Sequence, residues 1–271
     1  MTIRTSSAAV LSLLLAGPAL AAVSPLDIVR PVAEYKIYVS EKTEKLVADT
    51  KSFTDAVKAG DVERAKALFA PTRMSWEAIE PIAELFSDLD ASVDSRADDH
   101  ELAEKDPAFT GFHKIEHGLF AEGTTDGLGP VADKLMTDIE DLRARIEEMA
   151  LPPEKVIGGA AVLMEEVAAT KISGEEDRYS GTDLWDFKAN TDGSRKIFDL
   201  VRPLIETEDS AFVRKVDASF TTVDTTLAKY RKGEGYAHYS ELTDADRRVL
   251  AANVNTLAED LSTLRGKLGL D

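Results

Sequence analysis

Signals that begin and end helices recur along most of the chain, whereas runs typical of strands are almost absent. Between Leu26 and Ala59, apolar residues recur at roughly helical spacing. Gly60 is suited to end this helix, and Asp61 is a suitable N-cap for the next one. The same signals predict helices over residues 26–59, 62–89, 111–120, 130–149, 154–171, 182–205, 210–232 and 244–268. The sequence therefore predicts an all-α protein.

Two prolines fall inside the helix predicted over 62–89. We expect both Pro71 and Pro81 to bend or break it, because proline lacks a backbone donor and clashes with the preceding turn. The region that follows them should therefore be less regular than the long helix before it.

The clearest internal break is the pair Pro152-Pro153, which has roughly four helical stretches on each side. Short connections between successive helices favour antiparallel packing. We therefore expect two antiparallel four-helix bundles, one over residues 26–151 and one over 152–271, within a single helical domain that spans 22–271.

The first residues are typical of a secretory signal peptide. Arg4 supplies a positive charge, residues 8–16 form a short apolar run, and a small-residue cleavage site ends at Ala21. We expect residues 1–21 to be removed when the protein is exported. No later apolar run is long enough to cross a bilayer, so we expect no direct insertion into a membrane.

The charge of the chain restricts its partners. It contains 32 Lys and Arg against 50 Asp and Glu, a formal net charge of −18. Nucleic acid and anionic lipid both need a basic face, so neither is expected as a partner, whereas metal cations are. The chain has no cysteine, which excludes disulfides, thiolate metal sites and cysteine nucleophiles. A metal site in this chain must be built from oxygen and imidazole ligands.

His113 and Glu116 form the motif most suggestive of metal chemistry. Residues three apart share one face of a helix, so an imidazole and a carboxylate can converge on one ion. By itself this pattern is common in helices that bind no metal. Two segments, 88–116 and 174–190, are however rich in carboxylates and depart from regular bundle patterning. A buried carboxylate needs a partner, and a cation would supply one.

Four strings, in the same order along the chain, resemble the imelysin-like family of EfeO/EfeM-type periplasmic iron-uptake proteins. They are A-I-E-P-I-A-E, D-L-D-x-x-V-D-x-R-A-D-D, T-G-F-H-K-I-E-H-G-L-F and G-E-E-D-R-Y-S-G-T-D-L-W-D-F-x-A-N-x-D-G. The resemblance covers essentially the whole chain after the predicted signal peptide. Because the helical region begins soon after that peptide, the chain is similar to the single-domain form that lacks a cupredoxin domain. The resemblance implies a pair of four-helix bundles, with a metal site between or beside them.

The resemblance also implies a set of ligands, because the His-x-x-Glu motif of that family helps to bind a metal ion. The implied metal ligands in this chain are His113, Glu116, Glu80, Asp94 and Glu176. Glu175 is the alternative to its neighbour Glu176. Carboxylates with one imidazole form a hard site that suits Fe³⁺ or Fe²⁺, and zinc or another divalent cation also accepts these donors.

The function implied by the resemblance is capture of iron in the periplasm and its delivery to a membrane iron permease. A periplasmic peroxidase of the same uptake system is implied as a further partner. One alternative is a metallopeptidase, because His113 to His117 matches the H-x-x-E-H order of inverted zinc peptidases, in which both histidines bind zinc and the glutamate is the base. The other is binding of alginate or another acidic polysaccharide through bridging cations. We expect a binding protein rather than an enzyme.

Overall fold

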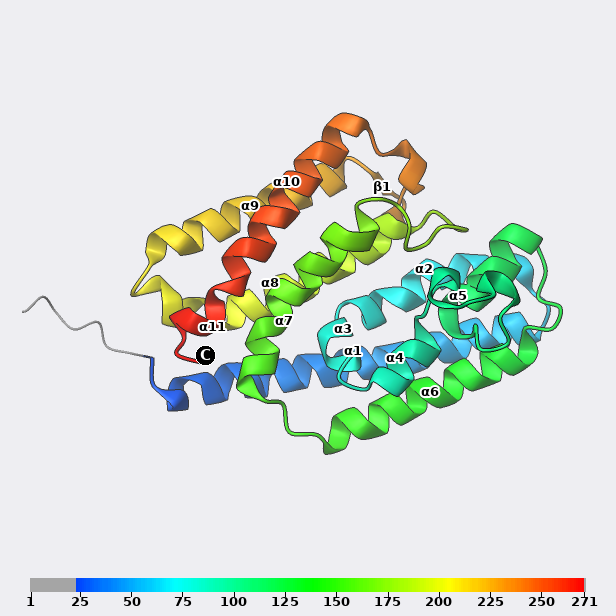
Figure 1. Ribbon diagram of the computed structural model, residues 1–271, viewed down its shortest axis with the longest axis horizontal. Coiled ribbons are helices and arrows are strands. Elements are labelled where there is room, and N and C mark those ends of the chain that lie inside the picture. The colour runs from blue at the N-terminus through cyan, green and yellow to red at the C-terminus, as the bar shows by residue number, and fades with distance from the viewer. Residues whose placement is uncertain (1–22, 271) are drawn as a thin grey trace, which may run out of the picture.

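The computed structural model describes residues 23–270, and the predicted signal peptide, residues 1–21, lies outside the described residues. The prediction of an all-α fold is confirmed (Figure 1). The α-helices are α1 Pro25–Lys58, α2 Val62–Glu77, α3 Glu80–Ala83, α4 Ser87–Val93, α5 Gly111–Glu116, α6 Gly129–Glu148, α7 Pro153–Glu166, α8 Asp183–Glu206, α9 Ser210–Ala228, α10 Asp244–Ser262 and α11 Leu264–Lys267. The other elements are the π-helical turns η3 His117–Glu122 and η4 Val167–Lys171, the 3₁₀ turns η1 Ala97–Asp99, η2 Ala103–Lys105 and η5 Tyr239–Glu241, and the two-residue strands β1 Arg231–Lys232 and β2 Gly235–Tyr236.

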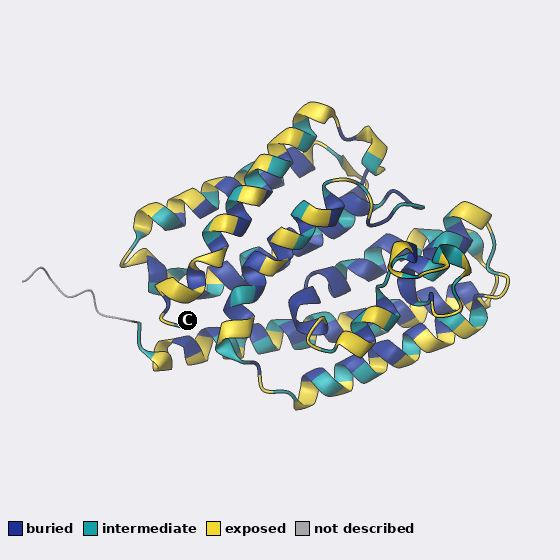
Figure 2. Ribbon diagram, viewed as in Figure 1, coloured by how far each residue is buried: buried dark blue, intermediate teal, exposed yellow. Residues whose placement is uncertain are grey.

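The helices pack in two neighbouring groups that share a core. Helix α1 packs along α2 and α6, whereas α7, α8, α9 and α10 pack mainly against one another (Figure 1). Contacts of α8 with α1 and α2, and of α3 with α7, join the groups. Buried apolar residues of both groups form one continuous cluster on the inner helix faces (Figure 2). The division into bundles at residues 151 and 152 remains a prediction.

The periodicity of α1 explains its place in this core. Its buried residues include Tyr35, Val39, Leu46 and Phe53, which are four or seven positions apart and so lie on one face. Ser24 caps the helix by accepting from the Leu26 backbone N–H, and its own N–H donates to Asp27. This face explains why a helix of 34 residues packs against helices from both groups.

The helix predicted over 62–89 is broken, but Pro71 is not the cause. Pro71 lies inside α2, which continues to Glu77, so the helix is not broken at this proline. The chain leaves the helix at Ala78 and Ile79, and Pro81 lies in the first turn of α3. Proline is tolerated in a first turn because its missing N–H would have no partner there.

Two helices end in π-helical turns, which the sequence patterns did not predict. Helix α5 continues into η3 and α7 continues into η4. A π-helical turn holds an extra residue, so it shifts the direction of the side chains that follow, and such turns are frequent at functional sites. Thr110, which precedes α5, makes no side-chain capping hydrogen bond.

The helix predicted over 210–232 ends earlier than expected, at Ala228. The following residues form a hairpin in which Arg231 pairs with Tyr236 and Lys232 pairs with Gly235. Gly233 has a φ of +60°, a conformation that favours glycine and turns the chain back. Over residues 23–270, no helix combines the length and the apolar character needed to cross a membrane.

Candidate metal centre

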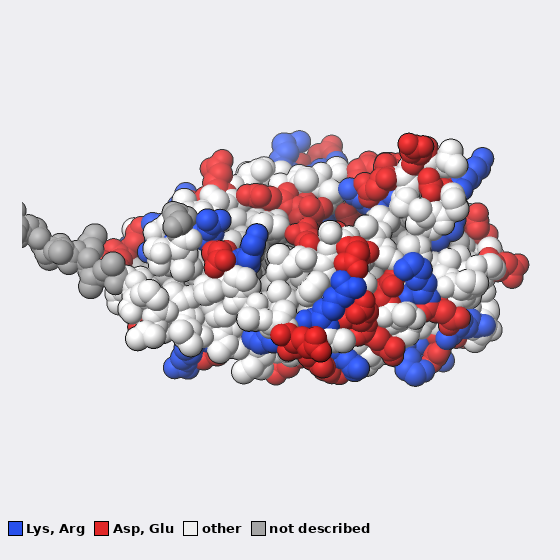
Figure 3. Space-filling view, turned by 60° about the horizontal axis from the view of Figure 1, so that its bottom comes forward, with Lys and Arg blue, Asp and Glu red and all other residues white. Residues whose placement is uncertain are grey.

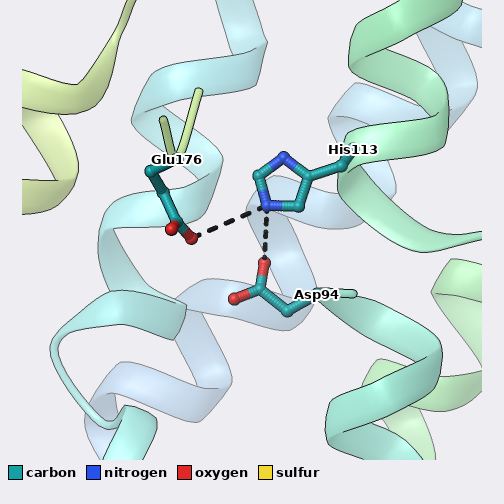
Figure 4. Close-up of side chains that lie close together, drawn as sticks. All are labelled: Asp94, His113 and Glu176. Carbon is teal, nitrogen blue, oxygen red and sulfur yellow. Dashed lines mark ion pairs between the residues drawn. The ribbon is translucent and has the colours of Figure 1, made fainter. Parts of the chain in front are cut away.

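Three of the predicted ligands converge from three separate parts of the chain (Figure 4). His113 comes from α5, Asp94 follows the last residue of α4, and Glu176 lies in the loop before α8. The Nε2 atom of His113 lies 3.4 Å from Oδ1 of Asp94 and 3.7 Å from Oε1 of Glu176. His113 is 1% exposed, and its Nε2 makes no hydrogen bond. A buried ring nitrogen that makes no hydrogen bond therefore lies between two carboxylates.

The other ring nitrogen of His113 is held by Glu116. Nδ1 lies 3.0 Å from Oε2 of Glu116. The other oxygen, Oε1, accepts from the backbone N–H of Tyr179 at 3.1 Å, from the N–H of Ser180 at 2.8 Å and from the Ser180 hydroxyl at 2.9 Å. A carboxylate held on both sides fixes the orientation of the imidazole, as partners of metal-binding histidines commonly do.

A second group of potential ligand atoms lies on this side of the ring. It contains His113, Glu116 and Asp177, with Nδ1 of His113 4.0 Å from Oδ1 of Asp177. Only one ring nitrogen at a time can be protonated in neutral imidazole, so the two groups compete for its lone pair. The group with Asp94 and Glu176 has the nitrogen without a hydrogen bond.

Glu80 and Glu175 lie apart from both groups. Glu80 accepts a hydrogen bond of 2.9 Å from Asn190 Nδ2, and its other oxygen lies 3.6 Å from Nζ of Lys171. The side chain of Glu175 is 61% exposed and pairs with Arg178. Of the two neighbouring glutamates, it is therefore Glu176 that faces His113.

A buried arginine, missed by the sequence analysis, holds the carboxylates in place. Arg73 is 0% exposed and donates to Glu77, Asp94 and Asp186, the last at 3.0 Å. Its Nη2 also lies 3.3 Å from Oε1 of Glu176. The signal was present in the sequence, because Arg73 shares the buried face of α2 with Ala65, Phe69 and Trp76.

A buried lysine is the second missed residue. Lys171 is 0% exposed, and its Nζ lies among carboxylates of both helix groups without a hydrogen bond. The distances from Nζ are 3.1 Å to Glu77, 3.6 Å to Glu80, 3.7 Å to Glu176 and 3.9 Å to Glu166. Lys171 is the last residue of η4, so helical periodicity could not place it.

The cations and carboxylates shift one another's pKa values. Burial raises the pKa of Asp94, but attraction to the positive charges of Arg73 and His113 outweighs this effect and brings the pKa down to about 2. Burial likewise opposes ionisation of Glu176, yet Lys171 and His113 bring its pKa well below the ordinary range. The carboxylates of Asp94 and Glu176 are therefore ionised at neutral pH.

His113 and Lys171 carry positive charge in the metal-free site. Burial and Arg73 lower the pKa of His113, but the facing carboxylates of Asp94, Glu116 and Glu176 raise it well above the ordinary value. Burial lowers the pKa of Lys171, and attraction to Glu176 and its neighbours raises it by more. A cation bound at Nε2 would have to displace the proton on His113, because imidazole coordinates a metal only when it is deprotonated.

An acidic pocket of about 280 Å³ leads to these side chains. Its charged lining residues are Glu80, Glu84, Asp90, Asp94, Asp99, Glu166, Glu176 and Arg96. Burial and the nearby Asp94 and Glu84 raise the pKa of Asp90 to about 7, which shows how crowded the carboxylates are. On the face in Figure 3, acidic side chains are interspersed with basic and uncharged ones. Such a pocket attracts cations and repels polyanions.

Comparison with known proteins identifies the family. The sequence model of the imelysin family matches residues 31–264. The chain belongs to the imelysin family. It is 61% identical over 254 residues to the iron uptake system component EfeM of Pseudomonas syringae pv. syringae (strain B728a), which covers 93% of this chain and 89% of that protein. It is 60% identical over 240 residues to the iron uptake system component EfeO of Escherichia coli (strain K12), covering 89% of this chain and 64% of EfeO.

His117, the further residue of the H-x-x-E-H order, belongs to neither group of potential ligands within the described chain. Its Nδ1 lies 3.8 Å from Glu122, and its ring packs against Tyr179 with centroids 4.9 Å apart. The structure therefore does not pair His117 with His113 as an inverted zinc peptidase requires. The arrangement of imidazole and carboxylates can instead hold a hard cation.

Proposed function

We propose that this chain is the periplasmic metal-binding component of an iron-uptake system, which captures iron at Asp94, His113 and Glu176. The observation that carries the proposal is the buried Nε2 of His113, which has no hydrogen bond and lies between two ionised carboxylates. These donors fit iron because oxygen ligands with one imidazole suit hard and borderline cations. The names of the EfeM and EfeO relatives support iron as the cargo.

The geometry supports a path for the ion. The acidic pocket raises the local concentration of cations, and two of its lining residues, Asp94 and Glu176, are also proposed ligands. Iron replaces the proton on His113, while Glu116 holds the ring in position. The same pocket provides the exit when the protein delivers iron to a membrane permease. Export, with removal of residues 1–21, would bring the chain into the periplasm, where it can meet that permease. A periplasmic peroxidase is proposed as the further partner.

The test is metal binding by protein isolated from the periplasm without an affinity metal. We expect wild-type protein to bind about one iron ion. The affinity of His113→Ala should fall by more than about 10–100-fold, the loss typical when a residue that holds a metal ligand is replaced. His100→Ala is the matched control, because His100 is bonded to Ser95 and belongs to neither ligand group. Equal iron binding by His113→Ala and wild type would overturn the proposed site.

A further inference from the structure

The two buried cations beside the metal centre are held in different ways. Arg73 donates hydrogen bonds to four carboxylates, those of Glu77, Asp94, Asp186 and Glu176, so its guanidinium is held from several directions. The ammonium of Lys171 lies close to four carboxylates but makes no hydrogen bond with any of them. Arg73 therefore acts as a rigid part of the scaffold, whereas Lys171 is held by charge alone on a flexible stem.

Lys171 and the proposed metal position share one oxygen atom. Oε1 of Glu176 lies 3.7 Å from Nζ of Lys171 and 3.7 Å from Nε2 of His113. Only four residues separate Lys171 from Glu176, and the lysine ends the π-helical turn that precedes this loop. An ion bound by Glu176 and His113 would thus lie close to the positive charge of Lys171. The site is buried, so salt screens the repulsion between the two charges only weakly.

We propose that Lys171 is a tethered counter-cation that sets the affinity of the metal centre. Its ammonium forms ion pairs with Glu176 and Glu80 while the site is free of metal. When the ion binds, Lys171 repels it and competes for Glu176, which keeps the cargo releasable. This inference rests on the proposed function, because it assumes the cargo binds beside Glu176.

The test replaces Lys171 with methionine, which fills a similar volume without charge. We expect Lys171→Met to bind Zn²⁺ about 10–100-fold more tightly, because the variant removes the repulsion between the ammonium and the ion. Transfer of the ion to a chelator should slow correspondingly. Lys188→Met is the matched control, because Lys188 pairs with Asp192 and Asp224 and shares no carboxylate with the metal centre. Its affinity should equal that of wild type.

A second probe separates electrostatic repulsion from a structural role. Coulomb repulsion scales with ionic charge, so the logarithmic gain in affinity should be about 1.5 times larger for Ga³⁺ than for Zn²⁺. A change caused only by altered packing would show no such ratio. Ga³⁺ is redox-inert and can be supplied from a weak chelate, so the measurement needs no control of iron oxidation.

A compensated variant guards against misfolding. Removing Lys171 takes away a positive charge that neutralises the buried carboxylates of Glu77, Glu80 and Glu176. The double variant Lys171→Met with Glu77→Gln also removes one negative charge and so restores the local charge balance. This folded double variant should still bind more tightly than Glu77→Gln alone. Unchanged or weaker binding in both Lys171 variants would overturn the inference. Retention of binding by His113→Ala would instead overturn the proposed function, so the two failures are distinguishable.

Discussion

The two nitrogen atoms of His113 face environments that differ in one essential respect. On the Nδ1 side, Glu116 is saturated by hydrogen bonds from Tyr179 and Ser180. On the Nε2 side, Asp94 and Glu176 lie near a nitrogen that has no hydrogen bond, and both line an acidic pocket. We call these the closed side and the open side of the ring. We propose that the closed side orients the imidazole and that the open side takes the ion.

The largest effect should come from the open side. In Glu176→Gln, metal should no longer stabilise the protein, because an ion that binds the native state alone stabilises it by mass action. For the wild type this gain is about 2.7 kcal/mol at a hundredfold excess over the dissociation constant. Thermal unfolding with and without metal measures it. Glu175→Gln, at an exposed neighbouring position, is the control and should retain the full shift.

If Glu176→Gln kept the full metal-induced shift, the ion would not be bound on the open side. The loop between η4 and α8 would then contribute no ligand there, although Glu176 lies 3.7 Å from the ring nitrogen.

The second effect is the pH dependence of binding. Burial and Arg73 lower the pKa of His113 in the folded protein, but the facing carboxylates of Asp94, Glu116 and Glu176 raise it by more. Protonation therefore stabilises the metal-free protein fully below the unfolded-state pKa of about 6.5, and this contribution is lost as pH rises through the folded-state value. Below that value each bound ion releases a proton, so affinity should fall about tenfold per pH unit.

Calorimetric titration in buffers of different ionisation enthalpy should show release of about one proton from His113 at neutral pH. Affinity that stays constant between pH 6 and pH 8 would show that the ring is not the group displaced, and would remove the distinction between its two sides.

The closed side should produce smaller losses. Glu116→Gln keeps the shape of the side chain but weakens its hold on Nδ1, so we expect a 10–100-fold loss of affinity. Ser180→Ala removes one of three hydrogen bonds to Glu116 Oε1, worth about 1 kcal/mol, so the loss should be within about tenfold. Titration of both variants with the same metal gives the order.

The opposite result would favour the second ligand group. If Glu116→Gln lost binding as completely as His113→Ala, and Asp177→Asn did the same, the ion would bind on the closed side. Glu116 would then be a direct ligand, as the family resemblance implies.

Local patterns account for much of the helical fold. The face of α1 that carries Tyr35, Val39 and Phe53 follows from apolar spacing, and Asp61 caps α2 through the Arg64 N–H as its sequence position predicts. The π-helical turns and the place of the break before Pro81 could not be predicted in this way. They depend on tertiary contacts of α2, α5 and α7, which local propensity does not contain.

The site was predictable only in part. His113 and Glu116 could be singled out by helical spacing, whereas Asp94 and Glu176 entered through the family resemblance, because no periodicity links residues in separate loops. Arg73 and Lys171 were missed, since a buried cation is stable only when distant carboxylates surround it. Helical spacing and family resemblance therefore identify candidate ligands more readily than the buried cations that lie beside them.

The smallest expected effect concerns His117 and decides between binder and peptidase. An inverted zinc peptidase uses both histidines of H-x-x-E-H as ligands and the glutamate as a base. In the structure the His117 ring packs on Tyr179 and its Nδ1 lies near Glu122, away from both groups of ligand atoms. We therefore expect His117→Ala to retain wild-type metal affinity within about threefold, and to lose at most about 1 kcal/mol of stability with the ring contact.

The metal-binding and peptidase functions predict opposite orders of metal affinity for His117→Ala and Glu116→Gln. In a peptidase, His117→Ala would lose the metal, while Glu116→Gln would keep it and lose only cleavage of an unfolded protein substrate. In the binder, Glu116→Gln is the weaker variant because it loosens the imidazole on the closed side, and His117→Ala has no ligand to remove. Metal titration of both variants, with a cleavage assay on the wild type, distinguishes the orders. Metal loss in His117→Ala together with cleavage by the wild type would contradict the assignment of open and closed sides, because the metal would then need a nitrogen that the structure turns toward Glu122.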